Sequence, residues 1–208
     1  MDKIGFVGLG NMGRGMSINL SKKKYEVIGF DTNSSVFQEL EKYNIQQINS
    51  LVDVAKETNI IITMLPDGKA VKSVWNDLIE IVEDDTILVD CSTIDVKTSL
   101  EVQKKANSRC IETLDAPVSG GVVGANNGTL TFMIGGKSET FRKVENLFNI
   151  MGSKSILCGN NGAGQTAKIC NNMLLASTMI AVGESFKLGK NLGLDLNKLF
   201  DVLSTSSG

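Results

Sequence analysis

Short apolar segments alternate with longer polar stretches over the first 162 residues of the chain. Runs of β-branched and other apolar residues predict buried strands, and the stretches between them have the length and spacing of amphipathic helices. Strands that alternate with helices are typical of an α/β fold, in which helices cover both faces of a mainly parallel sheet. We predict strands at residues 3–7, 26–30, 60–64, 86–89, 110–114, 131–134 and 155–158.

The pattern changes after a cluster of glycine and asparagine residues at 159–162, which is typical of a domain boundary. Beyond it we predict one long helix over 163–190 and a short one over 195–203. The chain then divides into an α/β domain at 1–162 and the start of a truncated all-helical domain at 163–208. Apolar residues lie on more than one side of the long helix, which indicates burial by a partner. We expect a homo-oligomer or a further C-terminal segment to cover it.

A glycine motif, Gly8-Leu9-Gly10-Asn11-Met12-Gly13, follows the first strand and leads into a helix. In this context the GxGxxG pattern indicates a Rossmann-type, doubly wound sheet that binds a dinucleotide. Gly8 permits the tight turn, Gly10 lets the backbone approach a pyrophosphate, and Gly13 lets helix and strand pack closely. Backbone N–H groups at the helix start then face the anion. The alternative is a glycine-rich turn without a ligand.

Asp31 ends the second strand, where a carboxylate can accept hydrogen bonds from the adenosine ribose and repels a 2′-phosphate. Thr32 and Asn33, which follow it, bring no cation to neutralise such a phosphate. The sequence therefore favours NAD over NADP. The alternative is that Asp31 only caps a helix starting near Ser34.

Composition excludes several other classes of partner. Lysine and arginine number 21, aspartate and glutamate 23, and 5% of residues are aromatic, which argues against nucleic-acid binding. The most apolar run, 173–182, is too short to cross a membrane. The four cysteines lack a CxxC pattern and lie in apolar or strand-like contexts, so we expect reduced core thiols. No targeting segment is visible before the first strand, so we expect a cytoplasmic or already processed chain whose partners are small anions.

The chain contains no histidine, so another group must accept the proton if an alcohol is oxidised here. Lys168 is the leading candidate, and Asn172 follows it at i+4 on the same face of the long helix. To act as a base, Lys168 must have its pKa lowered by burial or by a nearby cofactor charge. The alternative is an ordinary surface lysine.

Two strand ends carry further polar groups. Ser119, Gly120 and Gly121 offer a hydroxyl and two amides without side chains, which can hold a small carboxylate. A plain turn is the alternative. The segment 91–93 lies at the carboxyl end of a strand, where open α/β sheets bind ligands, although it could equally be the N-cap of the next helix.

Four ordered motifs, FVGLGNMG, LVDCSTID, DAPVSGGVVGANNGTLTFMIGG and GAGQTAKICNNMLL, closely resemble those of the 3-hydroxyisobutyrate dehydrogenases in the β-hydroxyacid dehydrogenase family. The resemblance implies NAD-dependent oxidation of 3-hydroxyisobutyrate to methylmalonate semialdehyde in valine breakdown. It implies that Lys168 takes the hydroxyl proton. Substrate-binding residues would be Ser119, Gly120, Gly121 and Asn172. Cofactor-binding residues would be the glycine motif, Asp31, Leu65, Pro66 and Thr93. It places the protein in the mitochondrial matrix of a eukaryote, or otherwise in the cytoplasm.

The sequence departs from this family in two ways and leaves other functions open. Ala70 stands where relatives often carry a cofactor-contacting asparagine, and relatives continue with further helices beyond the end of this chain. One alternative is a related β-hydroxyacid dehydrogenase or a semialdehyde or glyoxylate reductase. Phosphogluconate dehydrogenases carry a histidine where this chain has Asn171. A third alternative is a truncated NAD-binding relative without catalytic activity.

Overall fold

The computed structural model describes residues 3–207 and separates the chain into two compact units, one ending at Lys168 and one starting at Ile169. This division falls inside helix α8 (Ala163–Asn191), whose first residues belong to the first unit. The domain boundary after residue 162 stays a prediction. Each unit is described by itself.

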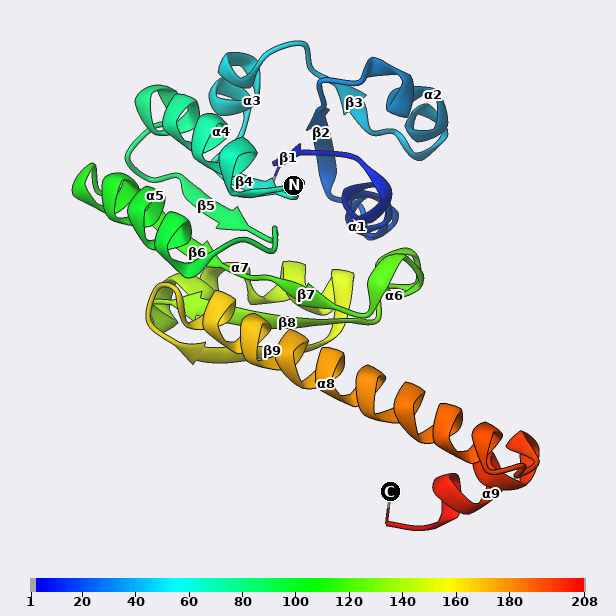
Figure 1. Cartoon of the computed structure of the whole chain (residues 1–208). Helices are drawn as coiled ribbons and strands as arrows, with labels where there is room; N and C mark the ends of the chain where they lie inside the picture. Colours follow the sequence, from blue (N-terminus) through cyan, green and yellow to red (C-terminus); the bar gives the residue numbers. More distant parts are fainter. Residues whose placement is uncertain (1–2, 208) are drawn as a thin grey trace. The chain divides into compact units, whose positions relative to one another are not determined.

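The first unit is built on one sheet, which has nine strands within residues 3–207 (Figure 1). The strand order is β3-β2-β1-β4-β5-β6-β8-β7, and β9 pairs with β8. From β3 to β6 the neighbouring strands are parallel, whereas β8 runs antiparallel to β6 and β7. The strands are β1 (Lys3–Val7), β2 (Glu26–Phe30), β3 (Gln46–Gln47), β4 (Ile60–Thr63), β5 (Ile87–Asp90), β6 (Glu112–Asp115), β7 (Val118–Ser119), β8 (Leu130–Gly136) and β9 (Gly152–Gly159).

Helices cover both faces of this sheet and create two hydrophobic cores. One core is covered by α1 (Asn11–Lys22), α2 (Phe37–Leu40), α6 (Gly121–Asn127) and α7 (Ser138–Met151). The other is covered by α3 (Leu51–Glu57), α4 (Gly68–Ile81) and α5 (Val96–Ser108). Side chains alternate between the faces of a strand, so Ile4 and Phe6 enter the first core and Val7 enters the second. The predicted doubly wound α/β fold is confirmed.

All seven predicted strands are present; the first two have the predicted bounds, and the ends of the other five differ by up to three residues. Two strands, β3 and β7, were not predicted because each has only two residues and no periodic pattern.

The prediction of four core thiols is wrong for three of the cysteines. All four are free, and Cys91 is buried at the end of β5, but Cys110, Cys158 and Cys170 are exposed. Cys110 occupies a turn with φ 63°, and Cys158 lies on β9, which pairs with β8 and with no other strand of residues 3–207. An apolar or strand-like sequence context therefore did not imply burial at these positions.

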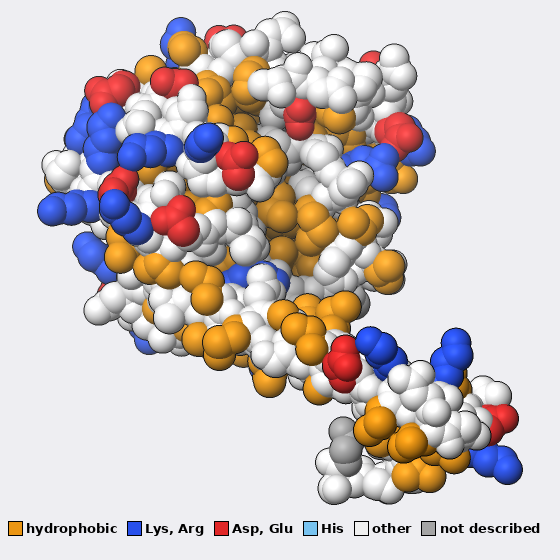
Figure 2. Space-filling model, viewed as in Figure 1, with side chains coloured by type: hydrophobic (Ala, Val, Ile, Leu, Met, Phe, Trp, Pro, Cys, Tyr) orange, Lys and Arg blue, Asp and Glu red, His pale blue; other side chains and the backbone are white. Residues whose placement is uncertain are grey.

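The second unit consists of α8 from Ile169 onward and α9 (Leu196–Thr205). The bounds of both helices agree with the predicted ones to within two residues. Asp195 caps α9 by accepting hydrogen bonds from the N–H groups of Asn197 and Lys198. Many apolar side chains of these two helices are exposed, as the orange surface in Figure 2 shows; they include Met173, Leu174, Met179, Ile180 and Phe200. In the part of the chain that the structure describes, no helix is both long and apolar enough to span a membrane.

Candidate cofactor and active site

A cavity of about 400 Å³ opens at the carboxyl ends of β1, β2 and β4. This volume is within the range of ligand pockets, and much of the lining is apolar, as expected for a site that holds flat rings. Figure 2 shows hydrophobic side chains gathered in the hollow at the middle of the first unit's visible face. The lining consists of Val7, Gly8, Gly10, Asn11, Met12, Gly13, Phe30, Asp31, Thr32, Met64, Leu65, Pro66 and Val74.

The glycine motif forms a tight turn on one wall of this cavity. Gly8 has φ +92°, and a Cβ atom there would lie 2.3 Å from the Met64 carbonyl oxygen. A Cβ at Gly13 would lie 1.9 Å from the Gly8 carbonyl oxygen, so this position must stay bare for the helix to follow the turn. At Gly10, by contrast, an added Cβ meets no atom within 4 Å. Open space over Gly10 fits a pyrophosphate that approaches the backbone closely.

Helix α1 starts at this turn, and the backbone N–H groups of its first turn are available to bind an anion. Its N-cap is Gly10, no side chain makes a capping hydrogen bond, and the first turn contains no acidic residue. The first N–H groups of a helix lack partners within the helix and carry its positive partial charge. The residues present therefore fit a bound phosphate group.

Asp31 connects the glycine turn to the loop after β2. Its Oδ2 accepts a hydrogen bond from the Leu9 N–H at 2.7 Å, and its Oδ1 accepts one from the Asn33 N–H at 2.8 Å. The alternative that Asp31 caps the next helix is wrong. The cap of that short helix, Ser34–Val36, is Asn33, whose side chain accepts a hydrogen bond from the Ser35 N–H. The carboxylate is thus held at the rim of the cavity with lone pairs left to accept from a ligand hydroxyl.

Two further loops carry the other predicted cofactor residues. Leu65 and Pro66 line the cavity in the loop between β4 and α4. Thr93 is exposed in the loop between β5 and α5 and lies outside the cavity lining. The alternative that segment 91–93 caps the following helix is wrong, because Asp95 caps α5 by accepting from the Thr98 N–H at 2.8 Å.

The predicted substrate-binding segment lies where β7 meets α6. Ser119 ends β7, and Gly120 and Gly121 both have positive φ, at 127° and 60°. An added Cβ at Gly121 meets no atom within 4 Å, so its amide is sterically accessible. The segment thus presents a partly exposed hydroxyl and an open backbone, which suit a small anion.

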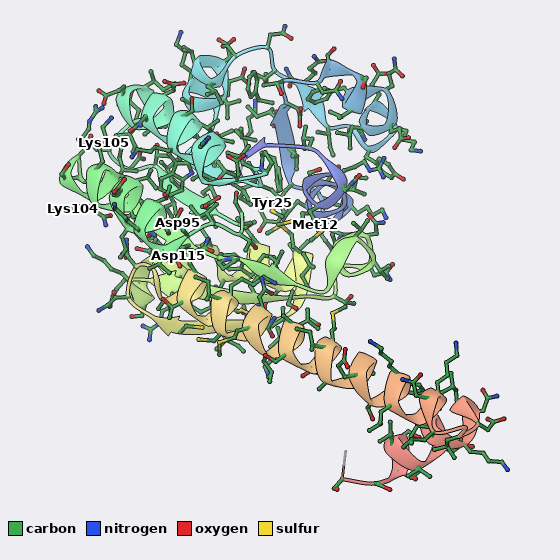
Figure 3. All side chains as sticks on the ribbon, in the orientation of Figure 1. Met12, Tyr25, Asp95, Lys104, Lys105 and Asp115 are labelled. Atoms are coloured by element: carbon green, nitrogen blue, oxygen red, sulfur yellow. The ribbon has the colours of Figure 1, made fainter. Side chains whose placement is uncertain are left out.

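Buried hydrogen bonds anchor the start of α8, which carries Lys168. The carboxylate of Asp115, labelled in Figure 3 near the first turn of α8, accepts from the N–H groups of Gly162 at 2.7 Å and Gln165 at 2.8 Å. Lys168 follows and is partly buried, and this desolvation lowers the pKa of its amine. Asn172 lies farther along the same helix, in the second unit, with an exposed side chain.

Three buried polar residues that were not predicted from the sequence join these loops: Asp90, Ser92 and Gln165. Asp90 ends β5 and accepts from Ser92 Oγ at 2.6 Å and from Thr63 Oγ1 at 2.8 Å. Burial raises the pKa of Asp90 to about 6, partly offset by these hydrogen bonds and reinforced by the nearby Asp115. The available signal was their place in the motifs LVDCSTID and GAGQTAK, but nothing in a single sequence shows that these polar residues are buried.

Two family models cover the chain. The model for the NAD binding domain of 6-phosphogluconate dehydrogenase matches residues 3–159. The model for NAD-binding of NADP-dependent 3-hydroxyisobutyrate dehydrogenase matches residues 162–208. Residues 3–159 are therefore an NAD-binding domain.

Two relatives and a solved structure are also similar to this chain. Identity is 43% over 207 residues to the "Probable 3-hydroxyisobutyrate dehydrogenase, mitochondrial" of Dictyostelium discoideum, covering 98% of this chain and 64% of that protein. It is 41% over 208 residues to the "Probable 3-hydroxyisobutyrate dehydrogenase" of Mycobacterium bovis, covering 100% of this chain and 71% of that protein. The chain thus spans less than two thirds of the Dictyostelium relative. The structure of Mycobacterium tuberculosis 3-hydroxyisobutyrate dehydrogenase with L-serine matches with a TM-score of 0.96 at 41% identity, covering 100% of this chain and 72% of that one. On these matches, together with the four motifs and the fold, the chain belongs to the 3-hydroxyisobutyrate dehydrogenase family.

Proposed function

We propose that the protein oxidises 3-hydroxyisobutyrate to methylmalonate semialdehyde with NAD as the hydride acceptor, as a step of valine breakdown. The single observation that carries this proposal is the partly buried Lys168, whose pKa is lowered by desolvation at the anchored start of α8. A lysine with a lowered pKa can be neutral at moderately alkaline pH and can then accept a proton. In a chain without histidine, this amine is the best available base.

When bound, NAD would supply the acceptor for the hydride that leaves the substrate carbinol carbon. The hydroxyl proton passes to the Lys168 Nζ atom, and the C–O bond becomes a carbonyl, which balances the two-electron oxidation. Lys168 then returns the proton to solvent. In the reverse direction the protonated amine donates to the carbonyl oxygen of the semialdehyde.

The substrate carboxylate is assigned to Ser119, Gly120 and Gly121, with Asn172 holding the substrate beside the lysine. Support comes from the open backbone at Gly121 and from the Mycobacterium tuberculosis relative, whose structure is described with L-serine. L-serine, like 3-hydroxyisobutyrate, is a small carboxylate with a hydroxyl on the third carbon. A related hydroxyacid or semialdehyde would fit the same groups.

We assign NAD rather than NADP because the Asp31 carboxylate lies at the cavity rim, where a 2′-phosphate would be repelled. The second family model is described by an NADP-dependent enzyme, so this preference needs a direct comparison of the two cofactors. A mitochondrial location in a eukaryote is part of the proposal and is supported by the name of the Dictyostelium relative. A cytoplasmic location is proposed for any other source.

The deciding experiment measures NADH formation by the purified chain with 3-hydroxyisobutyrate, L-serine, glycerate and 4-hydroxybutyrate, each with NAD and with NADP. We expect turnover that prefers 3-hydroxyisobutyrate and NAD. Lys168→Ala should lower kcat by about 10²- to 10⁴-fold, the usual contribution of a general base. The wild-type kcat/KM should rise with pH as Lys168 loses its proton, with a midpoint below the ordinary lysine value of 10.5.

Lys187→Ala is the matched control, because Lys187 is an exposed lysine on the same helix. It should leave kcat unchanged. If Lys168→Ala keeps wild-type activity, Lys168 is not the proton acceptor. If the wild-type chain binds NADH but turns over none of the substrates, it is a non-catalytic NAD-binding relative.

A further inference from the structure

Ser92 lies at the centre of a buried hydrogen-bond network in the first unit. Its N–H and its Oγ–H both donate to Asp90 Oδ1, at 3.1 and 2.6 Å. Its Oγ accepts the Leu65 N–H at 2.8 Å, and its carbonyl oxygen accepts from Gln165 Nε2 at 2.7 Å. A single fully buried serine therefore contacts the cofactor loop after β4, the end of β5 and the start of α8.

Gln165 forms the other half of this network, with a fully buried side chain. Its Nε2 donates to the Ser92 carbonyl oxygen, while its Oε1 accepts the Ile94 N–H at 3.2 Å. The amide therefore holds the backbone on both sides of Thr93. Its own N–H donates to Asp115. This arrangement requires a donor and an acceptor on one side chain, which among side chains of this length only glutamine provides at all pH values.

The network is rooted in the sheet rather than in flexible surface groups. Asp90 Oδ1 also accepts from Thr63 Oγ1, and Thr63 in turn accepts from Trp75 Nε1 at 3.1 Å. Asp90, Ser92, Thr63, Trp75 and Gln165 are all buried. Buried polar networks with their partners in place hold one geometry, because breaking a bond leaves a buried polar atom without a partner.

We infer that Ser92 and Gln165 are positioning residues, which fix the cofactor loop at Leu65 and Pro66 and the loop at Thr93 relative to the helix that carries Lys168. The inference rests on the proposed function. Ser92 acts toward the cofactor, because it holds the N–H of a residue that lines the cavity. Gln165 acts toward catalysis, because it ties the Thr93 loop to α8 one turn before Lys168.

The two roles predict opposite kinetic signatures. In Ser92→Ala the Leu65 N–H loses its acceptor, so the Kd of NADH should rise about 5- to 20-fold while kcat changes less than about threefold. In Gln165→Glu a carboxylate oxygen faces the Ser92 carbonyl, so kcat should fall about 10- to 100-fold through misplacement of the reacting groups. The Kd of NADH should change less than about threefold there, because the glycine turn and Asp31 are untouched.

The experiment measures NADH binding by fluorescence titration and steady-state kinetics for wild type, Ser92→Ala, Gln165→Glu and Thr166→Val. Thr166 is the matched control, because it is the next residue of α8 and its hydroxyl donates to the carbonyl of Gly162, the residue just before the helix. Gln165→Met, which buries an apolar chain of similar length, replaces Gln165→Glu if that variant does not fold. Circular dichroism confirms folding of each variant.

The expected split, with Kd affected by Ser92 and kcat by Gln165, supports the inference. A folded Gln165 variant with kcat within threefold of wild type overturns the role of Gln165, and so does an equal loss in Thr166→Val. An unchanged Kd of NADH in Ser92→Ala overturns the role of Ser92. A wild-type chain that binds NADH without any turnover instead refutes the proposed function and with it the role of Gln165, while the role of Ser92 is still decided by the Kd.

Discussion

Asp90 shows how the position of one residue makes stability depend on pH. It is fully buried, its Oδ1 carries all of its hydrogen bonds, and its Oδ2 has no partner among residues 3–207. Burial raises its pKa from 3.8 to about 6, with the nearby Asp115 carboxylate adding to the shift. The folded protein therefore prefers the protonated acid, and between about pH 4 and 6 it binds more protons than the unfolded chain.

The sign of this effect gives a prediction for Asp90→Asn. The stabilisation from protonated Asp90 is fully present below the unfolded pKa and is lost as pH rises through about 6. Asparagine keeps the accepting oxygen but cannot ionise. The free energy of unfolding of the variant, relative to wild type, should therefore increase by up to about 3 kcal/mol between pH 4 and pH 7. Urea unfolding at half-unit pH steps measures this difference.

Asp84→Asn serves as the control, since Asp84 is an exposed acid in the turn before β5. Its difference from wild type should stay flat over the same pH range. A flat difference for Asp90→Asn as well would mean that Asp90 is ionised in the folded protein throughout.

Among single residues, the sequence placed Asp31 after the second strand, and the structure shows it in the lining of the cavity. Its role as a cofactor ligand stays a prediction. The capping alternatives were wrong because several residues near each helix start could cap it, and only the backbone path selects Asn33 and Asp95. The roles of Lys168 and Ser119 stay predictions.

At the scale of elements, two glycines at the start of α1 have different roles: we expect Gly10 to affect cofactor binding and Gly13 to affect stability. A methyl group at Gly10 would enter the open cavity without touching protein, and the Gly10 backbone is extended at φ −65°, which alanine accepts. A methyl group at Gly13 would overlap the Gly8 carbonyl oxygen. The two positions differ although both belong to the same motif.

We predict that Gly10→Ala keeps the free energy of unfolding within about 0.5 kcal/mol of wild type but weakens NADH binding at least about tenfold. Gly13→Ala should lower the free energy of unfolding by about 1–3 kcal/mol, the usual cost of overpacking. Thermal unfolding and fluorescence titration measure both quantities. Equal NADH affinity in Gly10→Ala and wild type would show that the pyrophosphate does not approach this residue.

Elements with a periodic sequence pattern were predicted well. Short strands that form only by pairing with another strand were not. The seven predicted strands and the two C-terminal helices have enough residues to show a period. β7 is a strand only because two of its residues pair with β8, at Val118–Phe132 and Ser119–Thr131. Pairing of that kind depends on residues distant in sequence and leaves no local signal.

At the scale of the whole molecule, the two units differ in how many of their apolar side chains are exposed. The first unit buries them in two cores, whereas the second exposes Met179 at 66% and Ile180 at 67%. Exposed apolar patches of this kind mark interaction surfaces. Homo-oligomer formation stays a prediction, and the second unit is where we expect it to occur.

We predict that Met179→Lys lowers self-association of the chain, because it places a charge in the apolar surface. Sedimentation velocity over a range of protein concentrations measures the mass against the 22.3 kDa of one chain. Val52→Lys, at an apolar residue exposed on α3 of the first unit, is the control and should associate like wild type. A wild-type chain that stays monomeric at all concentrations would contradict the prediction.

The sequence by itself determined the doubly wound sheet, the glycine turn, the acid after β2 and the long C-terminal helix. Each depends on residues that are neighbours in the chain, through side-chain periodicity or through the conformation of glycine. Only the tertiary structure decided that Cys158 is exposed, that Asp90 is buried with a raised pKa, and that Ser92 and Gln165 join three loops. Those properties depend on burial and on hydrogen bonds between residues as far apart as 92 and 165, which come together only when the sheet and α8 pack.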